Sequence, residues 1–221
     1  IVLVETGRSW TYGDLAEAVQ RRATGLRSPH ARLISLEARP TGTFVVDYLA
    51  TFAAGHAALV GRSLDPDVRR RFEPVLVLDP PGGGSPVAVG EAPPLHPDLA
   101  LLLSTSGSTG SPKLVRLSHQ NLAANASSIA SYLDLTPDDA TITSLPLSYC
   151  YGLSLLHSHL VAGATVVLTD ASIADAAFWD LVRHHDVSTL AGVPHSFELF
   201  ERIGLGRLDL PALRRVTCAG G

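Results

Sequence analysis

Short apolar runs alternate with amphipathic helical patterns along most of this chain. The apolar runs are a few residues long and bounded by turn residues, as buried strands are, and the stretches between them repeat apolar residues at helical spacing. Parallel strands need a crossover connection, usually a helix, so this order predicts an α/β fold in which helices flank mostly parallel sheets. The predicted strands lie at 1–4, 33–36, 57–60, 75–78, 101–103, 141–145, 164–168, 187–191 and 216–218, and the predicted helices at 11–26, 43–55, from 65, 119–133, 155–161, 178–185 and 194–203.

One segment differs from the rest in composition. Residues 81–97 are rich in proline and glycine and include the run Gly82-Gly83-Gly84. Such residues favour turns and loops over helices or strands. We therefore predict a linker at 81–97 between a first α/β subdomain, 1–80, and a second, 98–221.

Composition excludes several classes of protein. The 221 residues are 46% hydrophobic with a formal net charge of −4, which allows a sizeable core and offers no basic surface for nucleic acid or an anionic membrane. No apolar stretch reaches the roughly 20 residues that a membrane helix needs. The two cysteines and nine histidines show no metal-ligand spacing. With no signal peptide visible at the N-terminus, a cytoplasmic location is expected.

A loop of small residues follows the leucine run 101–103. Its glycines allow a close backbone approach, and its hydroxyls add donors, a combination that suits phosphate oxygens. Lys113, at the end of the loop, is the only lysine in the chain, and its ammonium can act on phosphate as a point charge. The loop is not a Walker A motif, because Gly107 and Gly110 are three positions apart and Leu114 follows the lysine.

Thr105–Lys113 instead resembles the signature Thr-Ser-Gly-Ser/Thr-Thr-Gly-x-Pro-Lys of the adenylate-forming, or AMP-binding, superfamily. This superfamily comprises acyl-CoA synthetases, aryl-acid ligases, luciferases and the adenylation domains of peptide synthetases. Three further segments are similar to the family pattern: Trp10–Leu15, Ala53–Ala57 and Ser118–Leu122. Directly after the signature the chain departs from the family pattern, since Leu114 stands where the family usually has glycine.

The resemblance implies a site for ATP and Mg²⁺. The residues that it assigns to the β- and γ-phosphates are Thr105, Ser106, Gly107, Ser108, Thr109, Gly110 and Lys113. Lys113 would also be catalytic, by stabilising charge as pyrophosphate leaves. The hydroxyl of Thr105 is the expected metal ligand.

Two further groups of residues correspond to family positions around the acid and the adenine, although Ser148 and Tyr149 stand where the family commonly has phenylalanine and histidine. The acyl-substrate pocket is expected to include Tyr149, Cys150, Tyr151, Gly152 and His195, and the adenine-side turn Ala219, Gly220 and Gly221. Residues 145–153 contain no aspartate to pair with an α-ammonium group, which favours a fatty, aryl or other plain carboxylic acid over an amino acid. The alternative is that the two tyrosines are core residues with satisfied hydroxyls.

The expected reaction is ATP-dependent activation of a carboxylic acid to an acyl-adenylate, followed by transfer to coenzyme A. An alternative acceptor is the phosphopantetheine thiol of a carrier protein. The resemblance places the family's Mg²⁺-binding Glu, ribose-binding Asp and mobile-domain Lys beyond Gly221, so the chain alone is expected to be inactive. Two other classes stay open: a P-loop phosphotransferase, which requires a helix beginning at Lys113, and a non-catalytic nucleotide-binding or scaffolding remnant.

Overall fold

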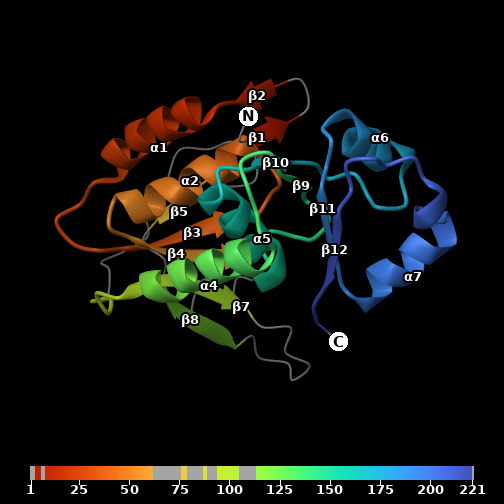
Figure 1. Ribbon diagram of the computed structural model, residues 1–221. Coiled ribbons are helices and arrows are strands. Elements are labelled where there is room, and N and C mark those ends of the chain that lie inside the picture. Colours follow the sequence, from red (N-terminus) through yellow and green to blue (C-terminus); the bar gives the residue numbers. More distant parts are fainter. Residues whose placement is uncertain are drawn as a thin grey trace. The chain divides into compact units, whose positions relative to one another are not determined.

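The structure is a computed structural model that describes residues 3–5, 8–61, 76–78, 87–88, 94–104 and 113–220 (Figure 1). By contact the chain forms two compact units. The first comprises Ile1–Tyr12, Asn125–Pro146 and Tyr151–Gly221, and the second Gly13–Ala124 and Leu147–Cys150. These boundaries differ from those of the predicted subdomains. Most of the predicted linker, 81–97, lies outside the described residues, and its role as a boundary stays a prediction.

The first unit contains a six-stranded sheet in the order β12-β11-β9-β10-β1-β2. Neighbouring strands are parallel except for β1 and β2, which pair antiparallel. The strands are β1 (Leu3–Glu5), β2 (Arg8–Trp10), β9 (Ala140–Ile142), β10 (Thr165–Val167), β11 (Thr189–Gly192) and β12 (Arg215–Cys218).

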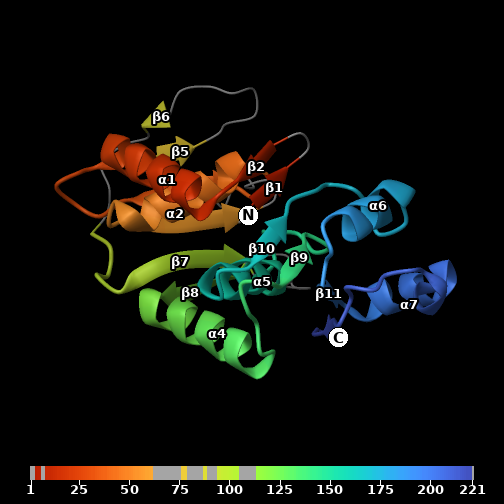
Figure 2. The ribbon, with the colours of Figure 1, turned by 45° about the horizontal axis from the view of Figure 1, so that its top comes forward.

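The helical elements of the first unit are α5 (Cys150–Val161), α6 (Ala176–His184), α7 (Pro194–Ile203) and the 3₁₀ turn η1 (Leu205–Arg207). Of these, α6 and α7 pack aromatic residues into a shared core. The rings of Trp179 and Phe200 meet edge to face at 6.1 Å, and Trp179 Nε1 donates to the Ile173 carbonyl at 2.8 Å. Figures 1 and 2 show α6 and α7 on the same side of β11 and β12. The core of this unit therefore joins both helices to the sheet.

The second unit contains another six-stranded sheet, in the order β6-β5-β3-β4-β7-β8. β3, β4, β5 and β7 run parallel, whereas β6 and β8 at the two edges pair antiparallel with their neighbours. The strands are β3 (Leu33–Glu37), β4 (Ala57–Gly61), β5 (Leu76–Leu78), β6 (Val87–Ala88), β7 (Leu99–Ser104) and β8 (Leu114–Ser118). The predicted α/β class with mostly parallel sheets is confirmed.

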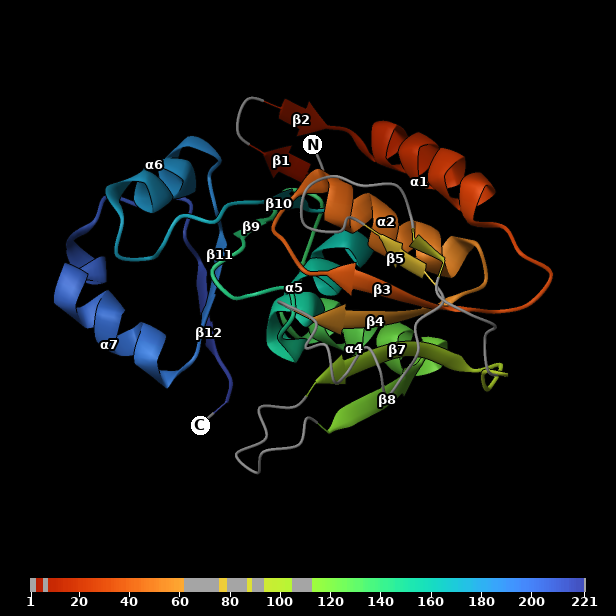
Figure 3. The ribbon, with the colours of Figure 1, turned by 180° about the vertical axis from the view of Figure 1, so that it is seen from behind.

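Three helices precede or follow strands of this sheet along the chain: α1 (Tyr12–Leu26), α2 (Gly42–Ala53) and α4 (His119–Tyr132). Of α4, the residues from Asn125 onward belong to the first unit. Figure 3 shows α2 alongside β3 and β4, which it contacts. α4 begins after a polar cap, because Ser118 Oγ accepts a hydrogen bond from the Asn121 N–H at 3.1 Å and Asn121 Oδ1 accepts one from the Ser118 N–H at 3.0 Å. The predicted start of this helix is confirmed. Among the described residues, no helix is long and apolar enough to cross a membrane.

The predicted start of α5 is wrong, and so is the predicted end of the strand before it. The sequence favours a helix over 155–161 after a strand over 141–145, but β9 ends at Ile142 and α5 begins at Cys150. Residues 150–152 are therefore the first turn of a helix and not part of a loop. Tyrosine and glycine are weak helix formers, so packing of this turn, and not propensity, determines its conformation. The helix predicted to start near residue 65 lies outside the described residues.

Candidate functional site

The predicted phosphate loop joins the ends of two paired strands. β7 and β8 are antiparallel, with Ser104 opposite Leu114, and Lys113 is an exposed residue immediately before β8. Residues 105–112 lie outside the described residues, so the phosphate contacts of Thr105–Gly110 and the metal contact of Thr105 stay predictions. A strand, not a helix, follows Lys113, and this excludes the Walker A arrangement of a P-loop phosphotransferase.

Leu114, the departure from the family pattern, has a packing role. Its partly buried side chain lies against the cluster formed by Leu33, Ala57, Leu59 and Leu102. The leucine therefore adds apolar contact to the core of the second unit.

The first turn of α5 carries three of the five predicted acyl-pocket residues, Cys150, Tyr151 and Gly152. Tyr149 is half-buried and precedes the helix, and Cys150 is exposed at its first position. A Cβ added to Gly152 would overlap the carbonyl oxygen of Pro146, so this buried position strongly favours glycine. The close approach fixes where the helix starts.

Tyr151 contacts the sheet through both its ring and its hydroxyl group. Its ring packs with Val193 against the buried residues Leu145, Leu155 and Ala191. Its hydroxyl donates to Thr217 Oγ1 at 2.6 Å. The phenol is thus satisfied within the protein, while the side chain remains only partly buried.

The predicted adenine-side turn continues directly from β12. The parallel pairing sets Gly192 of β11 opposite Cys218, and the Ala219 N–H donates to the Gly192 carbonyl at 3.3 Å. Gly220 has a φ of 88°, a left-handed conformation that suits glycine. Tyr151 contacts the strand that leads into this turn, at the carboxyl ends of β11 and β12, where open α/β sheets bind ligands. Gly221 lies outside the described residues.

His195 is placed differently from the Tyr151 group. It is exposed on the first turn of α7, and its Nδ1 lies 3.3 Å from Glu198 Oε2. Its assignment to the acyl pocket stays a prediction. Thr217 was not predicted as a site residue. Strand alternation gives a weak signal for it, since neighbouring Val216 points to the opposite face of β12.

Comparison with known proteins gives the family of this chain. The model of the AMP-binding enzyme family matches residues 65–221. The chain belongs to the AMP-binding enzyme family. A feruloyl-CoA synthase of Amycolatopsis sp is 30% identical over 250 residues, a match that covers 97% of this chain and 50% of the relative. This AMP-binding enzyme chain therefore spans about half the length of that curated relative.

Solved structures similar to this AMP-binding enzyme chain share its fold. O-succinylbenzoate coenzyme A synthetase from Bacillus subtilis, in complex with AMP, superposes with a TM-score of 0.81 at 21% identity, covering all of this chain and 64% of the other. The inhibitor-bound N-terminal domain of FACL13 from Mycobacterium tuberculosis gives a TM-score of 0.82 at 21% identity, covering 100% of this chain and 66% of the other. At this identity the likeness concerns the fold alone.

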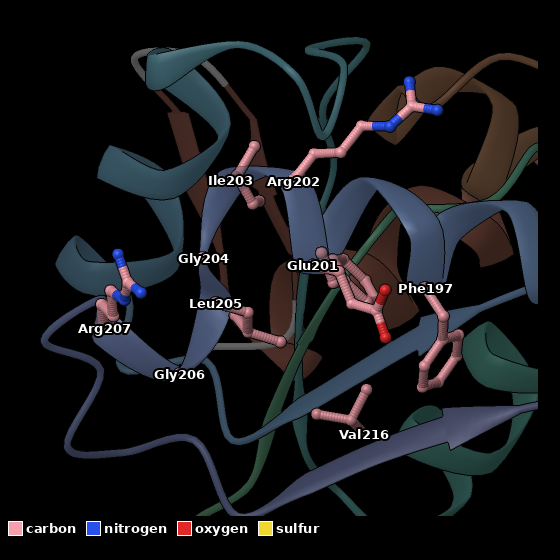
Figure 4. Close-up of a pocket in the computed structure, with 10 residues that line it drawn as sticks. Phe197, Glu201, Arg202, Ile203, Gly204, Leu205, Gly206, Arg207 and Val216 are labelled. Atoms are coloured by element: carbon pink, nitrogen blue, oxygen red, sulfur yellow. The ribbon is translucent and has the colours of Figure 1, made fainter.

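This AMP-binding enzyme also has a groove away from the predicted residues. About 600 Å³ in volume, it lies between α7, η1 and β12, with Val216 pointing toward Phe197 and Leu205 (Figure 4). None of the sequence-predicted site residues lines it. On β12, Thr217 therefore faces Tyr151, whereas its neighbour Val216 faces the groove.

The opposite ends of the strands hold an ionic network. Asp139 Oδ1 accepts hydrogen bonds from Ser188 at 2.7 Å, from Arg214 at 2.8 Å and from Arg215 at 2.7 Å. Burial raises the pKa of Asp139, but the hydrogen bonds from Ser188, Thr136 and Arg215 outweigh it and hold the pKa well below its ordinary value. Asp139 precedes β9, so this network joins the amino ends of β9, β11 and β12. Thr217, which accepts the hydrogen bond from Tyr151, lies near the carboxyl end of β12.

Burial favours the neutral form of both histidines of α5. Burial lowers the pKa of His157 to about 4 and also lowers that of His159. His159 Nδ1 donates to the Leu155 carbonyl at 2.9 Å in the neutral form. Within the described part of the chain, no group of three or more His, Cys, Asp or Glu residues could hold a metal ion.

Proposed function

We propose that the protein containing this chain activates a carboxylic acid with ATP and transfers the acyl group to coenzyme A. The observation that carries the proposal is the sequence Thr105–Lys113, set between the antiparallel strands β7 and β8 with Lys113 exposed at its end. Membership of the AMP-binding family supports it, as does the feruloyl-CoA synthase relative.

The first step forms a mixed anhydride. A carboxylate oxygen of the acid attacks the α-phosphorus of ATP, an O–P bond forms, and the bond to the bridging oxygen breaks as pyrophosphate leaves. The ammonium of Lys113 offsets charge on the β- and γ-phosphates, and the loop hydroxyls donate to their oxygens. Thr105 would offer Mg²⁺ an oxygen ligand of the kind it accepts, and the bound metal would supply positive charge to the phosphates.

The second step forms a thioester. The thiol sulfur of coenzyme A attacks the acyl carbon, a C–S bond forms, AMP leaves with its oxygen, and the thiol proton passes to solvent. A carrier-protein phosphopantetheine reacts in the same way and is the alternative acceptor. Acceptor choice is therefore tested separately from acid activation.

The acid is proposed to be a plain fatty, aryl or similar carboxylic acid. The residues around Tyr151 are aliphatic or small: Leu145, Leu155, Ala191 and Val193. Residues 145–153 contain no carboxylate to pair with a buried ammonium. An α-amino acid would lose the hydration of its ammonium without gaining a partner.

The test is ATP–pyrophosphate exchange in the complete protein with an aryl acid, a medium-chain fatty acid and an α-amino acid. We expect exchange with a plain acid, and about a hundredfold or greater loss in Lys113→Ala, the size typical of a removed transition-state donor. Arg116→Gln, which removes another exposed cation on β8, is the control. Exchange that is unaffected in Lys113→Ala would contradict the role of the lysine.

Two further measurements distinguish the alternatives. Product analysis with coenzyme A and with a phosphopantetheinylated carrier protein identifies the acceptor. The 221-residue chain alone is expected to show no measurable adenylation. A scaffolding remnant would show neither exchange in the complete protein nor a shift in melting temperature on ATP addition.

A further inference from the structure

A chain of two hydroxyl groups connects α5 to both β12 and β11. Tyr151 Oη donates to Thr217 Oγ1 at 2.6 Å, and Thr217 Oγ1 donates to the Leu190 carbonyl at 3.3 Å. Tyr151 and Thr217 are 66 positions apart in the sequence. The connection is therefore a product of the tertiary fold.

This arrangement restricts the conformation of Tyr151. Thr217 is β-branched and lies in a strand, so few rotamers are open to its side chain. Its hydroxyl accepts from the phenol while donating to the carbonyl of Leu190, a residue that is fully buried. The ring of Tyr151 packs against the cluster of Leu145, Leu155 and Ala191, and the phenol cannot move away without losing a hydrogen bond.

The hydrogen-bonded connection between Tyr151 and Thr217 lies where a ligand is expected to bind. Thr217 immediately precedes Cys218, and the turn that begins at Ala219 is held to Gly192. Tyr151 thus forms a fixed wall beside the carboxyl ends of β11 and β12. Movement of the ring would change the space at the point where open α/β sheets bind ligands.

We infer that Thr217 is a positioning residue that holds the ring of Tyr151 in place and thereby limits the bulk of the acid that the protein accepts. The inference rests on the proposed function, because it takes the Tyr151 side of the strands as the acyl site. Thr217 acts through Tyr151 and is not itself required to touch the acid. Slender acids bind more tightly because they contact the fixed ring of Tyr151, and bulky acids are excluded by the same ring.

The test compares Thr217→Val, which keeps the shape but removes the hydroxyl, with Thr217→Ser, which keeps the hydroxyl. In pyrophosphate exchange by the complete protein, we expect Thr217→Val to raise KM for slender acids about fivefold to tenfold, the effect of one lost hydrogen bond. KM for ATP should stay unchanged. The ratio of KM for bulky acids to KM for slender acids should fall by a similar factor. Thr217→Ser should restore most of the preference.

Two variants separate this role from general destabilisation. Tyr151→Phe should reproduce the ranking of acids seen in Thr217→Val, and the double variant should rank them in the same way, since the Tyr151–Thr217 hydrogen bond is absent from both single variants. Thr217→Val also removes the hydrogen bond to the Leu190 carbonyl, which Tyr151→Phe keeps. Ser144→Ala removes a comparable bond, from Ser144 Oγ to the Ala191 carbonyl at 2.6 Å, without touching Tyr151. It should leave the ranking of acids unchanged.

A second readout needs no catalysis. The chain has five tyrosines, so ¹³C-tyrosine NMR can follow each ring, with Tyr151→Phe assigning its signal. Thr217→Val should shift or broaden the Tyr151 signal, and Thr217→Ser should not. An unchanged signal together with an unchanged ranking of acids would overturn the inference. If the wild type exchanges with no acid at all, the proposed function and the acid selection both fail, while NMR still decides whether Thr217 holds Tyr151.

Discussion

Arg215 Nη1 donates a 2.7 Å hydrogen bond to Asp139 Oδ1, joining the start of β12 to the residue before β9 across 76 positions of sequence. The Asp139 side chain is 1% exposed and that of Arg215 is 21% exposed. β11 lies between these two strands, and its flanking residue Ser188 donates to the same carboxylate oxygen. One buried carboxylate thus aligns the amino ends of three strands.

Asp139→Asn should destabilise the protein substantially. The amide keeps the size of the side chain but leaves Arg215 without its counter-charge in a largely buried position. Removing one partner of such a pair is expected to lower the free energy of unfolding by about 2–4 kcal/mol. Urea unfolding measures this, with the exposed neighbour Asp138→Asn as control. Equal, small effects in the two variants would show that the network contributes little.

The same carboxylate should make stability depend on acidic pH. The pKa of Asp139 is held below its ordinary value in the folded state, whereas the unfolded chain binds a proton near pH 3.9. The unfolded state therefore binds more protons as pH falls through this value, and stability declines. The contribution is complete above about pH 5 and is lost toward the lower folded pKa. Unfolding free energies measured from pH 5 downward should fall less steeply in Asp139→Asn than in the wild type.

Local features of this fold were open to prediction from the sequence, and long-range ones were not. The turn residues around 105–113 indicate a connection between two strands, and Ser118 indicates a helix start, because both depend on neighbours within a few positions. Asp139–Arg215 and Tyr151–Thr217 depend on which strands become neighbours, and no spacing in the sequence encodes that. The α/β order predicts that the strands share a sheet but not their register.

The start of α5 could not be predicted from the sequence either, because contacts with residues outside the helix determine it. Cys150, Tyr151 and Gly152 are poor helix formers, so propensity delays the helix to residue 155. In the structure, Gly152 fits closely against the Pro146 carbonyl and Tyr151 bonds to Thr217. Tertiary contacts therefore extend the helix by a turn and carry predicted pocket residues onto it.

His157 should add a second, separate pH dependence. Burial lowers its pKa to about 4, so it is neutral in the folded state at pH values where an unfolded histidine, with a pKa near 6.5, is protonated. Between these values the unfolded state binds more protons, and stability falls as pH drops from about 6.5 to about 4. The slope from one such group is at most about 1.4 kcal/mol per pH unit. His157→Gln should reduce the slope of stability against pH in this window, where His159 also contributes, and should leave the fall below about pH 4, to which Asp139 contributes.

Gly152→Ala should be one of the most disruptive small substitutions in this chain. The added Cβ would overlap the backbone oxygen of Pro146, and backbone cannot rotate away as a flexible side chain can. Either the start of α5 or the 145–146 segment must shift, for which we expect a loss of about 2–3 kcal/mol in the free energy of unfolding. Gly25→Ala, in α1, is the matched control, because no atom lies within 4 Å of its added Cβ. Alanine there should stabilise the helix by up to about 1 kcal/mol. Thermal unfolding of the two variants should therefore move in opposite directions, and a neutral Gly152→Ala would mean that α5 does not pack as closely on Pro146 as the structure has it.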